Sequence, residues 1–511
     1  MRSLVSVCAH RVVSDHASLR RAMHLIPVEL YPALFAAAFY DHKTLALHDL
    51  VQRWPFPVLS FQKLLYGDGH SPVALRDTSS KQCVQSVILG VVAHLEDSLT
   101  KADTTNGTRA RRLQVLDVTG MQEDRLTREP HCMSLWSSTV AVAKACIDIH
   151  RRCSEKVHPK TKRRKGLRVR PMSPERPVNS PHVDVRVDLF VNSTSFSVLR
   201  EALLLSAHSP LRLQCRDLRV EELSLQSTSG LLALLSAPGV RKIDLRFNNL
   251  GFSGLNVLLP LMSRFTGLRS LKLPYSNIDV NRLTPLTEGA LQTFTSLLGQ
   301  LRDLRELNLG SSRLSGRLRQ LLGGLQTPLE SLELAFCYLL PADLLYLSAS
   351  VHASTLRKVD LSGNNLSVFL LQPFQRLLGA LSSVLLHLDI TECKLEDVHL
   401  AAITPALCSC SRLRYLSFSC NPISSQRLRT FLLDTVRLAE LRLVIHPLPT
   451  DCYNPRTPDD AADELQECGY DQEKVKQLGA ELQHMLLHAQ RTDMVWSTDL
   501  FQENVTDYLS P

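Results

Sequence analysis

Residues 356–366, with the sequence LRKVDLSGNNL, contain the pattern on which the fold depends. Leucine or valine stands at the first, fourth, sixth and eleventh positions of this stretch, and asparagine stands at the ninth. Apolar residues two apart in an extended segment point to the same face, so the stretch predicts a short strand with one buried side. The asparagine follows at the turn, where its side chain can satisfy backbone groups that would otherwise lack partners.

The same pattern recurs eight times within residues 201–450, a region in which 66 of 250 residues are leucine. The copies begin at Val240, Leu268, Leu304, Leu329, Leu356, Leu385, Leu413 and Leu438. Their spacing is 25 to 29 residues, apart from one interval of 36 that indicates an insertion around residues 279–288. This period and pattern are typical of leucine-rich repeats, so we predict an array of eight over residues 240–450.

Such an array belongs to the α/β fold class. We expect each repeat to supply one short parallel strand on the concave side of a solenoid and a helix on the convex side. Residues 255–265 and 371–381 have apolar residues three and four apart and are expected to be two of these helices. One repeat cannot bury its own apolar face, so stability comes from stacking, at roughly 1.5–3 kcal/mol for each buried leucine.

The regions before the array are expected to cap it and to carry a docking function. Residues 1–100 have a helical pattern broken by proline and glycine, and we interpret them as a helical N-terminal docking region. Residues 101–239 are predicted to be a degenerate repeat region and N-terminal cap, interrupted by a disordered, basic insertion at 151–181. Three segments of that cap resemble strands of the array: 113–120, 183–191 and 211–218.

The region after the array is predicted to be a C-terminal cap, residues 451–511. It contains one helix, near residues 473–490, in which apolar residues form a single stripe. A solenoid needs such a segment because its last repeat would otherwise expose an apolar face to water.

The formal net charge of +8 comes from one segment. Residues 156–170 contain eight Lys or Arg and no acidic residue, so the rest of the chain is neutral. This balance disfavours a nucleic-acid-binding surface spread over the fold. Within the segment, Lys162, Arg163, Arg164 and Lys165 resemble a nuclear localisation signal, and a solvated loop is the alternative interpretation.

Composition also disfavours several function classes. The thirteen cysteines are scattered through a long chain, which is typical of reduced thiols in the cytosol or nucleus. No apolar run reaches the ~20 residues that span a bilayer, and the charged N-terminus does not resemble a signal peptide. Phosphate loops, dinucleotide-binding glycines, nucleophile elbows and paired Cys-x-x-Cys motifs are missing, so we expect no catalytic residue, metal or cofactor.

The first twelve residues contain a candidate docking motif. Ser3-Leu4, Cys8 and Val12 fit the elongin-binding box, in which residues four apart form one apolar ridge on a helix. Ordinary core packing is the alternative for these side chains. The neighbouring valines also suit a strand, which would divide the ridge between two faces.

A second motif follows fourteen residues after Val12. Ile26-Pro27, Leu30 and Leu34 fit the cullin-2 box pattern. The same stretch also resembles the opening of an F-box, which would dock a Skp-type adaptor instead.

Several segments, in order along nearly the whole chain, resemble the PRAME family of leucine-rich repeat proteins. They are Ile26–Phe35, Trp54–Leu65, Leu113–Asp117, Lys160–Lys165, Val187–Phe190 and the repeats through Val444–Tyr453. The resemblance implies a substrate-recognition subunit of a cullin-2 RING ubiquitin ligase, bridged by elongins B and C. The resemblance to one branch of the family also implies a second role. In that role the chain would bind the IκB kinase (IKK-beta), disrupt its complex and so reduce Toll-like receptor and NF-κB signalling.

The concave face of the array is where a solenoid usually binds its partner. Before the turn asparagine or cysteine, three of the first four repeats carry an aromatic residue: Phe247, Tyr275 and Phe336. With Arg246 and Lys272 beside them, we predict an anchor patch with a basic rim that holds a client protein. The alternative is that these rings pack on the loops of neighbouring repeats.

We therefore expect a non-catalytic adaptor of the cytoplasm, and of the nucleus if the basic segment is used. Its expected partners are elongin B/C, cullin-2 and a protein client, with no membrane and no nucleic acid. Direct inhibition of the IκB kinase, without ligase activity, is the alternative.

Overall fold

The computed structural model describes residues 4–65, 80–102, 113–120, 134–157, 182–285, 288–453 and 469–498. In this part of the chain, thirteen strands follow one another in one sheet in the order of the sequence. The chain divides into two compact units, Met1–Ile243 and Asp244–Pro511. The predicted α/β leucine-rich repeat solenoid is confirmed.

The first unit combines a helical N-terminal region with the first strands of the sheet. Its strands are β1 (Val58–Ser60), β2 (Val115–Asp117), β3 (Val183–Val191) and β4 (Leu211–Val220). Its helices are α1 (Leu4–Ser14), α2 (His16–Ala22), α3 (Tyr31–Tyr40), α4 (Thr44–Gln52), α5 (Phe61–Leu65), α7 (Lys81–Ala102), α8 (Leu135–Val157), α9 (Phe196–Ser206) and α10 (Leu225–Leu234). The three strand-like segments predicted before the array are confirmed as β2, β3 and β4.

An aromatic cluster forms the core of the N-terminal helices. Phe35 of α3 makes edge contacts with Trp54, at 5.7 Å between ring centroids, and with Phe61 of α5, at 5.8 Å. Phe39, one turn later on α3, also contacts Phe61. All four side chains are buried, so α3 is the element on which this region is assembled.

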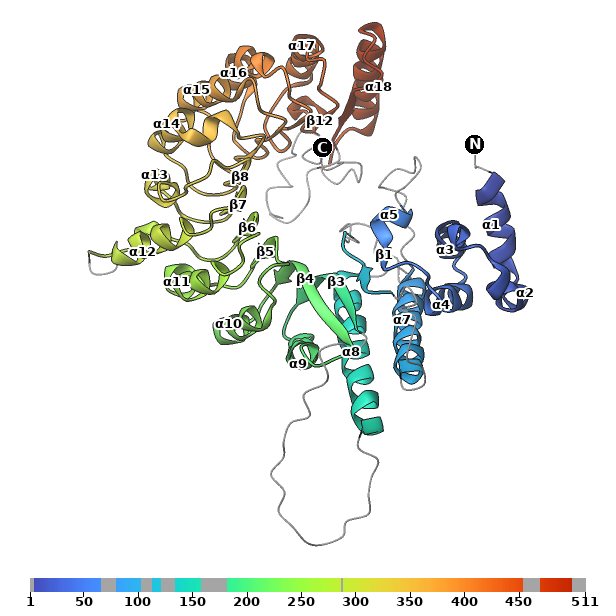
Figure 1. Cartoon of the computed structure of the whole chain (residues 1–511). Helices are drawn as coiled ribbons and strands as arrows, with labels where there is room; N and C mark the ends of the chain where they lie inside the picture. The colour runs from blue at the N-terminus through green and yellow to red at the C-terminus, as the bar shows by residue number, and fades with distance from the viewer. Residues whose placement is uncertain are drawn as a thin grey trace. The chain divides into compact units, whose positions relative to one another are not determined.

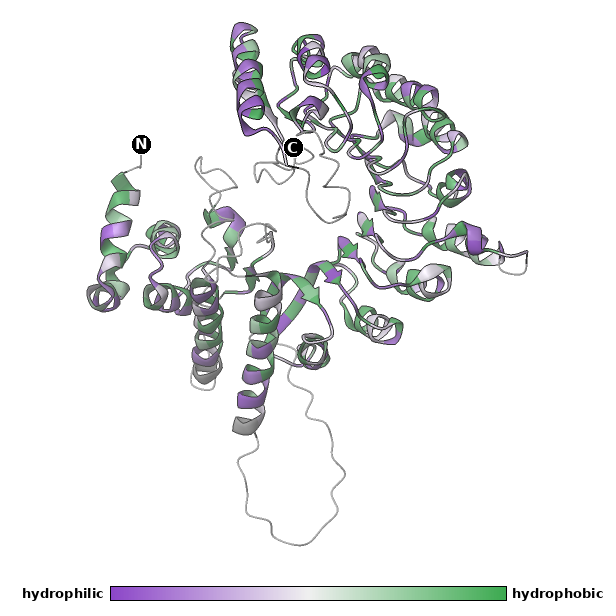
Figure 2. Ribbon diagram, turned by 180° about the vertical axis from the view of Figure 1, so that it is seen from behind, coloured by the Kyte–Doolittle hydropathy of each residue, from purple (hydrophilic) through white to green (hydrophobic). Residues whose placement is uncertain are grey.

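The second unit is a regular array with strands in one layer and helices in another (Figure 1). Its strands are β6 (Ser270–Lys272), β7 (Glu306–Asn308), β8 (Ser331–Glu333), β9 (Lys358–Asp360), β10 (His387–Asp389), β11 (Tyr415–Ser417), β12 (Leu443–Ile445) and β13 (Val495–Ser497), and β5 (Lys242–Asp244) lies at the boundary of the units. Its helices are α11 (Gly251–Met262), α12 (Glu288–Leu298), α13 (Leu318–Leu322), α14 (Pro341–Ala349), α15 (Leu371–Leu381), α16 (Asp397–Ser409), α17 (Ser425–Thr435) and α18 (Gln472–His488). The convex helices carry both hydrophobic and hydrophilic residues, as expected for helices with one buried face (Figure 2).

Two strands were not predicted. β1 pairs with β2 in parallel, with Leu59 opposite Leu116, and β13 pairs with β12, with Trp496 opposite Val444. Each has only three residues and lacks the leucine spacing of the array, so periodicity could not distinguish it from a loop. The predicted cap helix is confirmed as α18, whose Leu478, Leu482 and Leu486 are buried.

The predicted basic insertion begins later than expected. Helix α8 continues to Val157, so residues 151–157 are helical and the expectation of a disordered stretch from 151 is wrong there. Cys153 is buried on this helix, which explains why the helical pattern extends into the charged segment. The signal-like residues Lys162, Arg163, Arg164 and Lys165 lie outside the described residues.

Buried turn residues join each repeat to the one before it. The amide of Asn421 donates to the carbonyls of Ile390 (3.0 Å) and Phe418 (2.7 Å), and its oxygen accepts from the N–H groups of Cys393 and Leu395. Asn364 makes similar bonds two repeats earlier in the array.

Cysteine performs part of this role in other repeats. The thiols of Cys337 and Cys393 donate to the carbonyls of Leu309 (3.2 Å) and Leu361 (3.3 Å). Burial raises the pKa of Cys337 to about 12, so its thiol remains a neutral donor at physiological pH. The predicted role of the turn asparagine and cysteine is confirmed by these bonds.

We expect Asn421→Ala to lower the free energy of unfolding by roughly 2–4 kcal/mol, because it leaves buried backbone donors and acceptors without partners. Asn421→Cys should be less harmful, because a thiol can still donate across the repeats. Urea denaturation of the full chain measures both effects, and Gln426→Ala, at an exposed position of α17, is the control. Equal stability of Asn421→Ala and wild type would show that the turn bonds do not hold the array.

Candidate functional site

Helix α1 presents the predicted elongin-box residues to solvent. Leu4 is 79% exposed, Val12 is 42% exposed and Cys8 is exposed, whereas Ala9 and Val13 on the opposite side are buried. The helix packs against α3 through that buried side. The alternatives of core packing and of a strand are therefore wrong, and the three residues form one outward ridge.

The second motif is divided between surface and core. Pro27 and Leu30 are exposed and Ile26 is half-buried, so these three lie at the surface before α3. Leu34 is buried inside α3, so its prediction as a cullin-binding residue is wrong for this structure. Helix α3 packs against α1 and α4, and the side chain of Leu34 is enclosed in this region.

The three predicted aromatic anchors are exposed rings on strained backbone. Phe247, Tyr275 and Phe336 are 47%, 52% and 40% exposed, and their φ angles are +58°, +57° and +54°. We call these three residues the aromatic edge. The ring of Phe247 stacks on that of Tyr275, with centroids 4.7 Å apart.

The ring of Phe336 lies against the backbone of the next repeat. A Cβ atom on Gly363 would be 2.1 Å from Cδ1 of Phe336, so only glycine at 363 leaves space for the ring. The rings therefore do contact neighbouring repeats, as the alternative interpretation expected, and yet each keeps a large exposed face.

The left-handed conformation is a property of the turn rather than of the aromatic residues. The equivalent positions in seven successive repeats all have positive φ: Phe247, Tyr275, Ser311, Phe336, Gly363, Glu392 and Cys420. Glycine or asparagine adopts this conformation readily, whereas a bulky side chain loses about 1 kcal/mol or more. The three aromatic residues at such positions lower the stability of the fold and also leave apolar surface exposed. Because neither effect helps folding, a role in binding is favoured.

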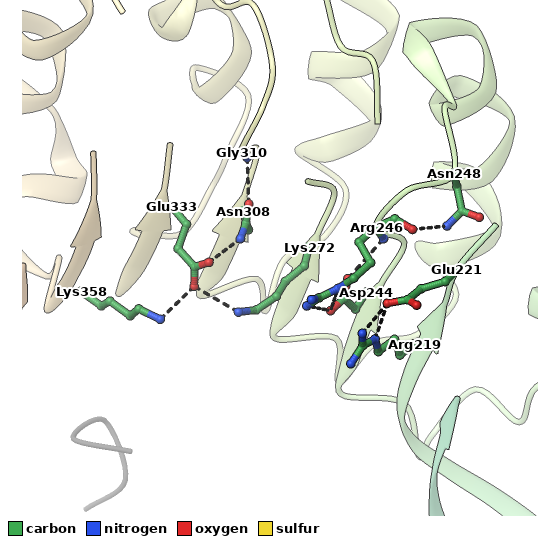
Figure 3. A network of polar contacts seen from close by, with 10 residues as sticks. All are labelled: Arg219, Glu221, Asp244, Arg246, Asn248, Lys272, Asn308, Gly310, Glu333 and Lys358. Carbon is green, nitrogen blue, oxygen red and sulfur yellow. Dashed lines mark hydrogen bonds and ion pairs between the residues drawn. The ribbon is translucent and has the colours of Figure 1, made fainter. Parts of the chain in front are cut away.

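The expected basic rim is neutralised. Arg246 forms an ion pair with Asp244, and Lys272 donates to the carboxylate of Glu333 at 3.1 Å (Figure 3). Both side chains are mostly covered. Arg246 and Lys272 therefore hold the concave surface together and do not offer free positive charge to a client.

Glu333 is the centre of that network. Its carboxylate accepts from Lys272 and from Lys358 (3.0 Å), and the amide of Asn308 also donates to it (Figure 3). Burial alone would raise the pKa of Glu333, but the two ammonium groups outweigh burial and lower the pKa to about 2.

Acidic residues in the next repeats were not predicted. Asp360 and Asp389 lie in register with Glu333 on β9 and β10. Burial raises the pKa of Asp360 to about 6, and the neighbouring carboxylate of Asp389 adds to the increase. Aligning the repeats on the residue between the second and third apolar positions of the pattern would have identified this row.

The described residues also bear on two further classes of site, a membrane span and a metal site. None of the described helices is both long and apolar enough to cross a membrane. Within the same residues, no three His, Cys, Asp or Glu side chains are grouped so that they could hold a metal ion.

The charge network makes stability pH-dependent with a definite sign. Because the folded pKa of Glu333 lies below its unfolded value of 4.5, Glu333 stabilises the fold above pH 4.5 and loses that effect as the pH falls toward 2. We expect Glu333→Gln to destabilise the chain by up to about 3 kcal/mol at pH 7 and by progressively less in acid.

Melting temperatures of wild type and Glu333→Gln between pH 7 and pH 3 measure this difference, and Glu392→Gln, at an exposed position, is the matched control. A constant difference across this range would show that Glu333 does not carry the charge.

Comparisons with known proteins agree with the fold and extend over the whole chain. Residues 2–125 match the PRAME N-terminal domain and residues 184–507 match the PRAME C-terminal domain. Leucine-rich repeat-containing protein 14 of Xenopus laevis is 60% identical over 512 residues, and that of Homo sapiens is 44% identical over 511, each covering 100% of both chains. Among solved structures, the leucine-rich repeat-containing protein LegL7 of Legionella pneumophila is 18% identical with a TM-score of 0.34, covering 45% of this chain and 74% of that one. The chain belongs to the PRAME family of leucine-rich repeat proteins, in the branch of leucine-rich repeat-containing protein 14.

Proposed function

We propose that the chain is a non-catalytic adaptor that brings a client protein to a cullin-2 RING ubiquitin ligase through elongins B and C. The observation that carries the proposal is the outward ridge of α1. Leu4, Cys8 and Val12 have the spacing of an elongin box and all lie on the face that the fold leaves uncovered.

An exposed ridge of this kind is unfavourable in an isolated protein. Leu4 and Val12 expose apolar side chains whose burial in a partner would contribute roughly 1.5–3 kcal/mol each. An amphipathic helix that presents apolar residues four apart is a recurrent way to fill a hydrophobic groove. The ridge therefore suits a groove on elongin C.

The cullin contact would use fewer residues than the motif suggests. Ile26, Pro27 and Leu30 lie at the surface, while Leu34 is buried. Leu25 and Val28 are also exposed beside them and enlarge the apolar surface. The same three surface residues could contact a Skp-type adaptor, so the identity of the adaptor is part of the test.

The client would bind the second unit at the aromatic edge. Aromatic side chains bring large contact area at low entropic cost and are the usual anchors of protein interfaces. Ubiquitin transfer is then carried out by the RING partner and its conjugating enzyme. The adaptor contributes proximity, by raising the local concentration of the client beside the activated ubiquitin.

Direct inhibition of the IκB kinase is the second candidate. It would use the aromatic edge of the second unit alone and would not need the ridge on α1. The two candidates therefore differ in whether α1 is required.

We expect the double variant Leu4→Ser, Cys8→Ser to lose capture of elongin C and cullin-2 from cell lysate, because it replaces the apolar ridge with hydroxyl groups. Both residues are exposed, so the melting temperature should not change. Affinity capture followed by blotting for elongin C, cullin-2 and a Skp-type adaptor measures the effect.

Leu45→Ser is the matched control, since Leu45 is an exposed leucine on α4 outside the motif. Capture of elongin C by the double variant at the wild-type level would contradict the ligase proposal. Capture of Skp by wild type would replace the elongin contact with the F-box alternative.

We expect Phe247→Asn, Tyr275→Asn to reduce client capture while leaving the free energy of unfolding within about 1 kcal/mol of wild type. Asparagine accepts the left-handed backbone, as Asn249 and Asn277 already do, and this gain offsets the lost ring stack. Quantitative mass spectrometry of proteins captured by each variant measures binding.

Denaturation curves provide the stability control in this experiment. A set of captured proteins identical to that of wild type would show that the aromatic edge is not the client site.

A further inference from the structure

A cavity of about 460 Å³ lies wholly within the first unit. Residues from the sheet and the loops beside it form its lining, chiefly Gln62, Asp117, Arg186, Gln214, Arg216 and Arg241. The proposed docking and client surfaces use none of these residues. We call this site the basic cavity.

The parallel sheet brings these side chains together. Asp117 of β2, Arg186 of β3 and Gln214 of β4 are consecutive partners in the strand register, so they form one row across the sheet. The N–H of Arg241 donates to the carbonyl of Arg216 at 2.7 Å, which places the segment before β5 directly beside β4.

Two charged side chains of the cavity, Arg216 and Asp117, already have hydrogen-bond partners. The guanidinium of Arg216 donates to both carboxylate oxygens of buried Asp188, at 3.1 and 2.9 Å. One oxygen of Asp117 accepts from the backbone and hydroxyl of Thr119. These bonds fix both side chains in position at the wall of the cavity.

The other two guanidinium groups are available. Arg186 and Arg241 are exposed, and neither forms an ion pair with another described residue. Each presents up to five N–H donors, and the side-chain amides of Gln62 and Gln214 add more. Arg216 is compensated by the carboxylates of Asp188 and Asp217, so Arg186 and Arg241, which share the lining with the single carboxylate of Asp117, are the guanidinium groups that a bound anion would engage.

We propose that the basic cavity binds a phosphoryl group carried by a segment of the client protein. The proposal rests on the proposed client-binding function and specifies the chemistry of that client. A phosphoryl group carries about two negative charges and three acceptor oxygens, which match a site made mainly of donors. A volume of about 460 Å³ also leaves room for residues on either side of the modified one.

The test uses the full chain and the peptide Ala-Ala-phosphoserine-Ala-Ala, titrated by calorimetry beside its unphosphorylated and aspartate counterparts and inorganic phosphate. We expect the phosphopeptide to bind at least tenfold more tightly than the other three ligands. Arg186→Gln, Arg241→Gln should weaken phosphopeptide binding at least tenfold, while Arg200→Gln, an exposed arginine on α9, should not change it.

Several results would overturn the proposal. Equal affinity for the aspartate peptide would mean that the cavity does not select phosphate, and equal affinity for inorganic phosphate would assign it to a free anion. Unchanged binding by the double arginine variant would place the contact elsewhere.

Capture of elongin C by the double arginine variant, measured in parallel, separates the two proposals. Retained elongin C with lost phosphopeptide binding supports the cavity as a client site of a functional adaptor. Absence of phosphopeptide binding by a wild-type chain that captures elongin C would overturn the cavity alone.

Discussion

The array depends on buried turn side chains that bond from one repeat to the next. Asn364 and Asn421 each use both ends of the amide, and Cys337 and Cys393 each use a thiol donor. Leucine packing alone would allow neighbouring repeats to slide, because apolar contact has little directional preference. The polar bonds fix the register, since a shifted repeat would leave backbone donors and acceptors buried without partners.

The same turns explain where the aromatic edge comes from. Closing the chain around the buried asparagine or cysteine forces the preceding residue into the left-handed region, and its side chain then projects from the surface. Most proteins would place glycine or asparagine there, as this chain does at Gly363. Phe247, Tyr275 and Phe336 instead combine backbone strain with exposed apolar surface. Residues held in that way are more often explained by binding than by stability.

Regular parts of the fold could be predicted from the sequence, and irregular parts could not. The eight repeats, the convex helices and the cap helix can all be predicted from the spacing of leucine, because each copy of a periodic pattern indicates the same local structure. Strands β1 and β13 have three residues each and no period to reveal them. Burial of Leu34 depends on the packing of α3 against other helices, and pairing of Lys272 with Glu333 depends on a partner 61 residues away. Both depend on tertiary contacts, which a local sequence motif does not specify.

The proposed surfaces share one physical property, which is that each is unfavourable until a partner binds. Leu4 and Val12 expose apolar area, the aromatic edge holds strained backbone, and two guanidinium groups of the basic cavity form no ion pair with another described residue. The ridge and the cavity belong to the first unit, whereas the aromatic edge belongs to the second. Changes at sites without shared partners usually have additive effects, so each surface can be altered without disturbing the others. An adaptor needs this independence, because it must hold a ligase and a client at the same time. A single-site inhibitor would have no reason to maintain the ridge on α1.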